Sequence, residues 1–500
     1  MLSPQSHVTD VERDRALQRL GIEAAFANTT AALTTGAILA AFALHLEANN
    51  FTIGLLAAIP FLAQIAQLPT IFLIEKTRAR KKIAVVSSVV GRAMLGIMAL
   101  LPFAGAYALP GLFVTALILC IMGAVGGCAW NAWLRDLTPD DRMGRVFARR
   151  TIYATVTLMI AGLAAGIGLQ FSGNDMQQRS LTFSGLYFVG CVSGLISAGI
   201  AARLPEPQMP VRSENDVSLW SIVRAPLGNQ NFRKLIIFIC WWQFAVNLAT
   251  PFFTVFLISS LGYGMGFVML LTIVSQLANA LTLSNWGRLT DRFNNRSVLM
   301  VSAPTYIFCI VAMIGASQFA QTDSRSAWLI GLHVLMGASL GGTTLAMTNM
   351  ALKLSPRGES TAYIATSGLL SSMAAGSAPI IGGLVADFFA VRQLAISASW
   401  SDPDGTFALL SLNLNHWDFF FLVSGIVGIF ALHRLSGVEE AGDIEQKQML
   451  QQIFAQTRSS INNLSTVPGL RALTEIPESI IRDAKIRTRW LRMRQAAGET

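Results

Sequence analysis

Residues 109–134 read LPGLFVTALILCIMGAVGGCAWNAWL, a run without one charged side chain. An α-helix rises 1.5 Å per residue, so this run spans about 39 Å as a helix, enough to cross the roughly 30 Å hydrocarbon core of a bilayer. Five arginines follow directly, between Arg135 and Arg150. The stretch therefore predicts a membrane-spanning helix that ends at a basic loop.

Apolar runs of similar length recur along the whole chain. Of its 500 residues, 53% are hydrophobic and only 13% are charged, whereas an average soluble protein has about 25% charged residues. Such a chain could not cover the surface of a soluble globule. We therefore predict twelve spanning helices near residues 22–45, 52–74, 83–103, 109–134, 147–171, 181–203, 234–258, 265–286, 297–318, 327–352, 362–388 and 416–434.

Basic residues alternate between the eleven connections of these helices. The even-numbered connections hold 20 Lys and Arg, and the odd-numbered ones hold three, Arg179, Arg325 and Arg392. The positive-inside rule then places both termini in the cytoplasm. The net charge of +9 therefore reflects topology, and we expect no nucleic-acid partner. Short loops and the absence of an organellar or signal presequence favour the bacterial inner membrane.

One connection divides the helices into two sets of six. It contains Pro205, Pro207, Pro210 and Pro226, which is typical of an interdomain linker. We predict a cytoplasmic N-terminal segment (1–21), a first six-helix bundle (22–203), a cytoplasmic linker (204–233), a second six-helix bundle (234–435) and a basic cytoplasmic tail (436–500).

The two halves share a sequence repeat. Residues 73–76 read LIEK and residues 289–292 read LTDR, and an arginine, Arg80 or Arg296, follows each four positions later. Both matches have the same offset of 216 residues, and a second pair, LTP at 137–139 and LSP at 354–356, has an offset of 217. A duplicated six-helix unit explains both pairs, and parallel six-helix repeats are a transporter architecture.

The second copy resembles the signature of the major facilitator superfamily, G-x-L-x-D-R-x-G-R-[RK]. Gly287, Leu289, Asp291, Arg292 and Arg296 match this signature, and the first copy keeps Leu73, Lys76 and Arg80. Over about residues 20–435, the resemblance implies an all-α fold of twelve transmembrane helices in two six-helix bundles. It also implies secondary active or facilitative transport of a small solute by alternating access, and no enzyme activity. A non-transporting substrate receptor or membrane assembly factor remains the alternative, because the first copy of the motif is degraded.

The charged residues of the motif lie at predicted cytoplasmic helix ends. An acidic group there can bond to cations of a neighbouring helix end and hold the inner mouth shut. From the helices that the family packs together, we expect Glu75 to pair with Arg135, and Asp291 with Lys353. The candidate gating residues are Glu75, Lys76, Arg80, Arg135, Gly287, Asp291, Arg292, Arg296 and Lys353. Alternatively, these charges only fix the topology.

Polar residues inside apolar runs are candidates for the solute cavity. Arg92 lies near the membrane midplane, where a cation needs a partner or a ligand; it binds an anionic substrate group, or it hydrogen-bonds an adjacent helix. The resemblance implies a cavity lined by helices 1, 4, 7 and 10. The candidates are Asn28, Thr34, Arg92, Trp241, Trp242, Gln243 and Asn247, and the alternative is interhelical hydrogen bonding without a solute.

Few side chains are candidates for ion coupling. Glu23 is the one acid within a spanning run away from the charged loops, about one turn above the inner face, and His45 and His333 lie toward the outer half. Each of the three could carry a proton, and uncoupled facilitated diffusion stays open. The five cysteines form no CxxC pair, so we expect no metal site. Since no phosphate-binding loop occurs, we also expect no nucleotide cofactor.

Two further patterns concern the partners of the chain. The end of the tail collects basic residues around Trp490, which would suit anionic lipid at the cytoplasmic leaflet, although a solvated tail is the alternative. Glycine pairs such as Gly123 and Gly127, Gly162 and Gly166, and Gly337 and Gly341 would let helices approach closely. The run GSAPIIGG at 376–383 resembles the glycine-proline run of drug antiporters, but it lies in the eleventh predicted helix instead of the fifth and does not establish export.

Overall fold

The computed structural model describes residues 4–5, 8–139, 142–173, 175–209, 226–319, 321–356, 360–402 and 405–440. The first half contains α1 (Asp10–Thr34), α2 (Ala37–His45), α3 (Asn50–Leu62), η1 (Ala63–Ala66), α4 (Gln67–Thr77), α5 (Arg80–Met98), η2 (Leu101–Phe103), η3 (Gly105–Tyr107), α6 (Ala108–Leu137), α7 (Met143–Phe171) and α8 (Met176–Ala202). The second half contains α10 (Gln230–Val255), η4 (Phe256–Ser260), α11 (Met265–Phe293), α12 (Asn295–Ala312), α13 (Ile314–Gln318), α14 (Thr322–Leu354), α15 (Ser360–Phe389), β1 (Gln393–Asp402), β2 (Gly405–Asn415) and α16 (His416–Ser436).

Twelve helical segments of the described chain are long and apolar enough to cross a membrane. The predicted all-α fold with twelve spanning helices is confirmed. Helix ends differ from the apolar runs, because an apolar run marks the lipid core and a helix can continue past it. Thus α1 begins at Asp10 instead of residue 22, since Thr9 and Glu12 form a capping box that satisfies its first backbone N–H groups.

The first two spans are each interrupted. Gly36 has a φ of 59°, a left-handed conformation that suits glycine, and it separates α1 from α2. Pro60 lies inside α3, and the tighter turn η1 begins three residues later. Packing against neighbouring helices makes such breaks tolerable within a membrane.

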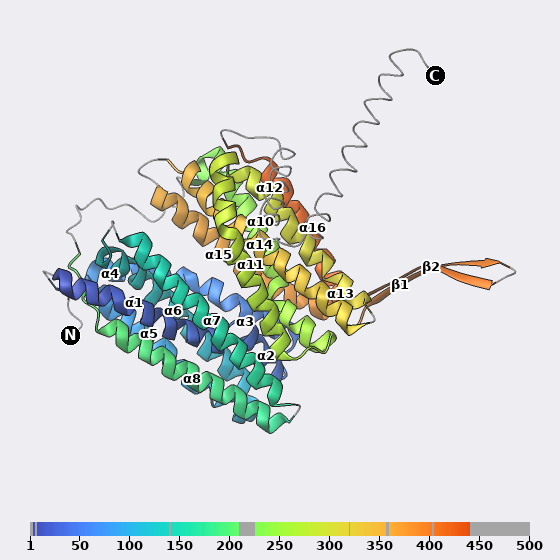
Figure 1. The fold of residues 1–500 in the computed structure, drawn as a ribbon, viewed down its shortest axis with the longest axis horizontal. Coiled ribbons are helices and arrows are strands. Elements are labelled where there is room, and N and C mark those ends of the chain that lie inside the picture. Colours follow the sequence, from blue (N-terminus) through green and yellow to red (C-terminus); the bar gives the residue numbers. More distant parts are fainter. Residues whose placement is uncertain are drawn as a thin grey trace, which may run out of the picture.

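The helices form two bundles with matching internal contacts (Figure 1). In the first bundle, α1 packs against α7 and α8, and α5 packs against α6 and α8. In the second, α10 packs against α15 and α16, and α12 packs against α14 and α16. Each contact in the first bundle has a counterpart in the second at the corresponding helix pair, as a duplicated unit predicts.

A β-hairpin separates the last two spanning helices. Strands β1 and β2 are antiparallel, pair Gln393 with Asn415 at the base, and have an irregularity between Ala398 and Ser399. The hairpin projects from the end of the second bundle (Figure 1). The sequence analysis placed only a connection here, because the search for apolar runs of bilayer length does not detect strands.

Each bundle has two distinct ends. We name the end that carries the start of α1, the end of α8 and the end of α16 the proximal end, and the opposite end, which carries the hairpin, the distal end. The odd-numbered connections lie at the distal end and the even-numbered ones at the proximal end. Most of the predicted linker and nearly all of the predicted tail, including its lipid-binding stretch, lie outside the described residues.

Candidate functional site

The two bundles meet along a seam between α3 and α15 near the distal end. A Cβ atom on Gly54 of α3 would overlap the carbonyl oxygen of Pro379 on α15. A Cβ on Gly383 would lie 2.6 Å from the carbonyl oxygen of Asn50. Glycine at both positions therefore lets the two backbones touch, which is the role expected from small residues in membrane helices.

Asp387 adds a charged contact at the distal limit of this seam. Its Oδ1 accepts a hydrogen bond from Nδ2 of Asn50 at 2.8 Å, and its Oδ2 accepts one from the backbone N–H of Phe51 at 3.0 Å. Both donors belong to the first turn of α3, where unpaired N–H groups and the helix dipole favour a negative charge. The carboxylate thus joins the second bundle to the first. The sequence analysis missed Asp387, because its partners lie 336 and 337 residues away.

A second seam joins α7 to α11, also near the distal end. A Cβ on Gly166 would lie 2.6 Å from Cγ of Met269, and one on Gly266 would overlap Oε1 of Gln170. The expected close approach at Gly166 is therefore present, and it occurs between the bundles, whereas a Cβ on Gly123 or Gly127 would meet open space. The bundles converge toward these seams and diverge toward the proximal end (Figure 1).

At the proximal end of the first bundle, Arg80 of the repeated motif is the centre of a buried cluster. Its guanidinium pairs with Asp136, lies 3.6 Å from Glu206, and donates to the carbonyl oxygens of Ala132 and Pro207 at 3.1 and 3.0 Å. The Arg80 and Glu206 side chains are 2% and 0% exposed. Burial raises the pKa of the Glu206 carboxyl, and the Arg80 guanidinium acts against that rise. The cluster ties α5, α6 and the chain after α8 together.

The second bundle has an equivalent cluster around Glu440. Its carboxylate accepts hydrogen bonds from Nζ of Lys353 at 2.9 Å, from Nδ2 of Asn295 at 2.9 Å and from the backbone N–H of Arg296 at 2.8 Å. The Arg296 guanidinium donates to the carbonyl oxygen of Ser436 at 3.0 Å. Because Arg296 corresponds to Arg80 in the repeat, both clusters fasten the same parts of the two bundles.

The other predicted gating residues lie on the proximal surface. Lys353 pairs with Glu440, so its expected pairing with Asp291 is not formed in this conformation. Asp291 is exposed, as are Glu75, Lys76, Arg135 and Arg292. Gly287 has open space where a Cβ would lie. The motif is thus split between buried clusters inside each bundle and an exposed charged rim.

Three ionisable side chains approach one another inside the first bundle. Glu23 of α1 is 6% exposed and accepts a hydrogen bond from Oγ of Ser197 on α8 at 3.0 Å. Arg150 of α7 lies 3.7 Å from its other oxygen, and Arg92 of α5 interacts electrostatically with the same carboxylate. The sequence analysis selected Glu23 and Arg92 separately; the fold brings them together and adds Arg150. We name Glu23, Arg92 and Arg150 the charged triad.

The predicted cavity residues divide into two groups. Gln243 and Asn247 on α10 are partly exposed, and Asn247 donates to the Gln243 carbonyl oxygen of its own helix. Asn28 is also partly exposed and bonds within α1. These three amides remain candidates for contact with a solute.

The remaining cavity candidates face the bundle interiors or another helix. Trp242 is 1% exposed and packs against Tyr306, so it belongs to the core of the second bundle. Trp241 contacts Phe430 of α16 edge to face. Thr34 is 3% exposed, and its methyl group lies where a Cβ on Gly190 of α8 would be. Helical spacing identified Gln243 and Asn247 as a polar stripe on α10. It did not tell that the adjacent Trp242 faces the core of the second bundle.

The two candidate coupling histidines have local partners. His45 lies 2.8 Å from Oγ of Ser180. His333 is 8% exposed and its Nδ1 lies 2.8 Å from the Leu329 carbonyl oxygen within α14. His45 also interacts electrostatically with Arg179, which has the same sign as a protonated histidine, whereas the cation near Glu23 has the opposite sign to its carboxylate.

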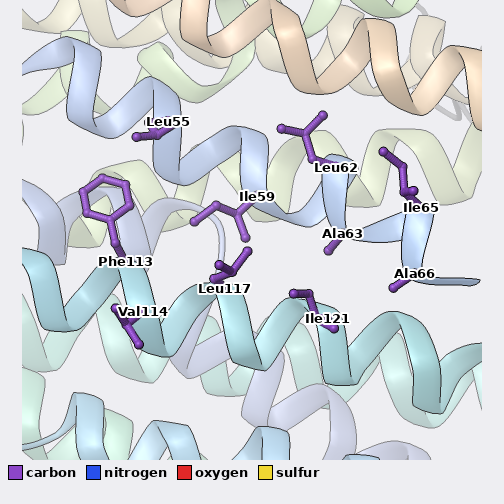
Figure 2. Close-up of a pocket in the computed structure, with 10 residues that line it drawn as sticks. All are labelled: Leu55, Ile59, Leu62, Ala63, Ile65, Ala66, Phe113, Val114, Leu117 and Ile121. Atoms are coloured by element: carbon purple, nitrogen blue, oxygen red, sulfur yellow. The ribbon is translucent and has the colours of Figure 1, made fainter.

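An apolar groove lies between the second and fourth spanning segments (Figure 2). Leu55, Ile59 and Leu62 face Leu117 and Ile121 of α6 across it, and its volume is about 590 Å³. All ten lining residues are Leu, Ile, Ala, Val or Phe. The groove thus offers apolar surface to a lipid chain and no side chain that would orient a polar solute.

Comparison with known proteins identifies the family of this architecture. The family model described as Major Facilitator Superfamily matches residues 24–275 and 243–474. A variant of the nucleoside transporter NupG has a TM-score of 0.66 at 14% identity, covering 85% of this chain and 100% of that one. A bacterial homologue of the human lysosomal transporter Spinster, in an inward-facing and occupied conformation, has a TM-score of 0.62 at 14% identity, with 88% and 100% covered. A D-xylose–proton symporter has a TM-score of 0.59 at 12% identity, with 88% and 99% covered. No curated protein matches the chain by sequence.

We predict that Arg80→Gln destabilises the protein by about 3–5 kcal/mol, because it removes the guanidinium that pairs with Asp136 and with the buried Glu206 carboxylate. The readout is the thermal unfolding midpoint of the purified protein in detergent. The control is Lys82→Gln, which removes an exposed cation two residues away. Equal midpoints for the two variants would show that the cluster does not hold the bundle together.

We also predict that Gly54→Ala opens the distal seam, since the added methyl group overlaps the α15 backbone and overpacking costs about 1–3 kcal/mol. Spin labels at Tyr107→Cys and Val391→Cys, which are 79% and 87% exposed in the wild type, would report the distance between the distal ends of the bundles. A longer distance component should appear in Gly54→Ala.

Gly123→Ala is the matched control for this variant, because a Cβ there meets open space. It should keep the wild-type distance distribution. An unchanged distribution in Gly54→Ala would mean that the seam does not limit distal opening.

Proposed function

Since the chain belongs to the Major Facilitator Superfamily and is an integral membrane transporter, not an enzyme, we propose that it moves a small solute by alternating access between its two bundles. The observation that carries the proposal is the pair of glycine seams. They close the distal end by close helix contact while the bundles diverge at the proximal end. This is one of the two end states that rocking bundles require.

The proximal end faces the cytoplasm in this proposal. Of the 20 basic residues of the even-numbered connections, those that the structure describes lie on that side, and the positive-inside rule assigns it to the cytoplasm of a bacterial inner membrane. The conformation is then inward-open. The hairpin and Asp387 lie at the periplasmic side, where Asp387 acts as a latch on the first turn of α3.

The buried clusters around Arg80 and Glu440 make each bundle move as one body. Both join helix ends within a bundle, so they persist while the bundles rock. The exposed Asp291 is the acid available to contact the facing bundle when the proximal end closes, which gives the repeated motif a role in the outward-open state. Glu75 and Arg135 lie on the same rim.

A small polar solute would pass between the bundles along the partly exposed amides Asn28, Gln243 and Asn247. Amides offer both donors and acceptors to a solute. The names of structural neighbours mention nucleosides and D-xylose, so uridine and D-xylose belong in a first binding panel beside amino acids and organic acids.

Glu23 is the coupling group that the geometry favours. It is buried, it has a cationic partner in Arg150, and its Oε2 atom lacks a hydrogen bond among the described residues. A carboxylate in this setting can exchange its cation for a proton as access alternates. The charged neighbour of His45 is the cation Arg179, which has the same sign as a protonated histidine, and the recorded contact of His333 is the Leu329 carbonyl oxygen.

We predict that Glu23→Gln abolishes solute accumulation driven by a pH gradient in proteoliposomes, while solute counterflow without a gradient persists. The neutral amide preserves shape and hydrogen bonding but cannot cycle a proton. The solute is whichever panel member stabilises the purified protein. Glu47→Gln, an exposed acid at the distal end, is the control and should accumulate solute normally.

Full accumulation by Glu23→Gln would exclude Glu23 as the proton site. Absence of counterflow by the wild-type protein with every stabilising solute would favour the alternative, a receptor or assembly factor that binds without turnover.

A further inference from the structure

The charged triad carries an excess of positive charge inside the membrane-spanning region. Its members come from the spanning segments Asp10–His45, Arg80–Phe103 and Val146–Phe171. Glu23 supplies one negative charge, whereas Arg92 and Arg150 supply two positive charges. Within the described chain, the recorded charge partner of both cations is this one carboxylate. One positive charge is therefore not neutralised in a region of low dielectric constant, where an unpaired charge is costly.

The hydrogen bonds of the triad are also incomplete. The Arg150–Glu23 separation of 3.7 Å exceeds hydrogen-bond length. The Oε2 atom of Glu23 and the Nε atom of Arg150 are buried and lack a hydrogen-bond partner among the described residues. Native proteins rarely leave such atoms unsatisfied. Since the Nε atoms of Arg80 and Arg296 also lack a partner, the unsatisfied donor points to an absent acceptor at the triad because it lies next to an uncompensated cation.

The surroundings of Arg150 leave it accessible on one side. Its side chain is 28% exposed, against 7% for Glu23. Its guanidinium carbon lies 5.8 Å from the centre of the Trp130 ring on α6. The ring stacks near the cation without neutralising it, so the guanidinium stays oriented while its N–H groups remain able to donate.

Arg92 is positioned by a glycine on the neighbouring helix. A Cβ on Gly194 of α8 would lie 2.5 Å from Cδ and 3.0 Å from Nε of Arg92. The stem of Arg92 therefore crosses α8 where there is no side chain, and its guanidinium is directed toward the Glu23 region. Glycine at 194 is thus a requirement for bringing the second cation to the triad.

We propose that the charged triad is the binding site for an oxyanion, a carboxylate or phosphate group of the transported solute. This inference deepens the proposed transport function and rests on it. Guanidinium groups present paired N–H donors that match the geometry of carboxylate and phosphate. One bound monoanion would neutralise the triad and accept hydrogen bonds from the partly exposed guanidinium of Arg150. Protonation of Glu23 would remove its negative charge and leave both arginines to attract the anion. Solute binding would then be linked to protonation of the coupling group.

The test is binding of small anions to the purified full-length protein. Sodium phosphate and sodium succinate are added, with sodium chloride at equal ionic strength as the salt control and uridine and D-xylose as uncharged solutes. A ligand of the folded state raises the unfolding midpoint with its concentration. We expect phosphate or succinate to raise the midpoint beyond the chloride control, and the uncharged solutes to do so less.

The variants Arg150→Gln and Arg149→Gln form a matched pair. Arg149 is the exposed neighbour that lies over Tyr153. Loss of a charge-assisted contact should weaken anion binding by about tenfold or more in Arg150→Gln, with affinity unchanged in Arg149→Gln. Should Arg150→Gln fail to fold, Arg150→Lys keeps the charge and removes the planar fork, and a weakened affinity for the anion is again expected.

A second pair tests the position of Arg92. Gly194→Ala should displace its guanidinium and weaken anion binding. Gly199→Ala, where a Cβ on the same helix meets open space, should leave binding unchanged. Equal anion affinities within both matched pairs, or no response of the wild-type protein to any oxyanion, would overturn the proposal.

A lipid headgroup offers the same chemistry, so the binding series is repeated in phosphatidylcholine nanodiscs with and without phosphatidylglycerol. Stabilisation by phosphatidylglycerol that depends on Arg150, without any effect of soluble anions, would assign the oxyanion to lipid and overturn its assignment to the solute. The distal spin-label distances distinguish a failure of the proposed oxyanion site from a failure of the proposed transport function. If the distances alternate between short and long values but no anion binds, the proposed transport function stands and the proposed oxyanion site is refuted.

Discussion

A membrane interior tolerates charge only where a second charge or a ligand compensates it, and most ionisable residues of this chain are placed accordingly. Arg80 is buried, but it has Asp136 and Glu206 as partners. Lys353 and the backbone of Arg296 share Glu440. These clusters lie at the proximal end, where water and helix ends can satisfy the remaining groups. The charged triad departs from the pattern because its charges do not cancel.

The contacts between the bundles have a different chemistry from the contacts within them. Within each bundle, buried ion pairs and aromatic packing, such as Phe252 against Phe420, hold helices together. Between the bundles, glycines such as Gly54 and Gly383 bring backbones into contact, and Gly166 makes room for the Met269 side chain. Asp387 adds two hydrogen bonds to the seam between α3 and α15. The seams lie along two helix pairs, α3 with α15 and α7 with α11, and contact concentrated along such pairs suits two bodies that rock against each other.

The duplication gives both bundles the same framework, and function depends on where they differ. Arg80 and Arg296 occupy equivalent positions and fasten equivalent helix ends. Glu23, Arg92 and Arg150 belong to the first bundle, whereas the amides Gln243 and Asn247 belong to the second. In the proposed mechanism the first bundle supplies charge recognition and proton coupling, and the second supplies neutral polar contacts. A solute with an anionic group and a polar neutral part would use both.

The sequence by itself determined that the chain lies in lipid and how many helices span the membrane, because these follow from the length of the apolar runs and the alternation of basic loops. It also determined the duplication and the family resemblance, because a motif recurs at a fixed offset. It also selected Glu23 and Arg92 as unusual, since a charge inside an apolar run is visible in one dimension. It could not find Asp387 or Arg150, whose roles arise from residues more than a hundred positions away. It also could not tell that Trp242 and Thr34 face bundle interiors, because a polar or aromatic stripe does not say which helix packs on it. Only the tertiary structure decided which helices meet and through which atoms, since close packing depends on the shape of all neighbours at once.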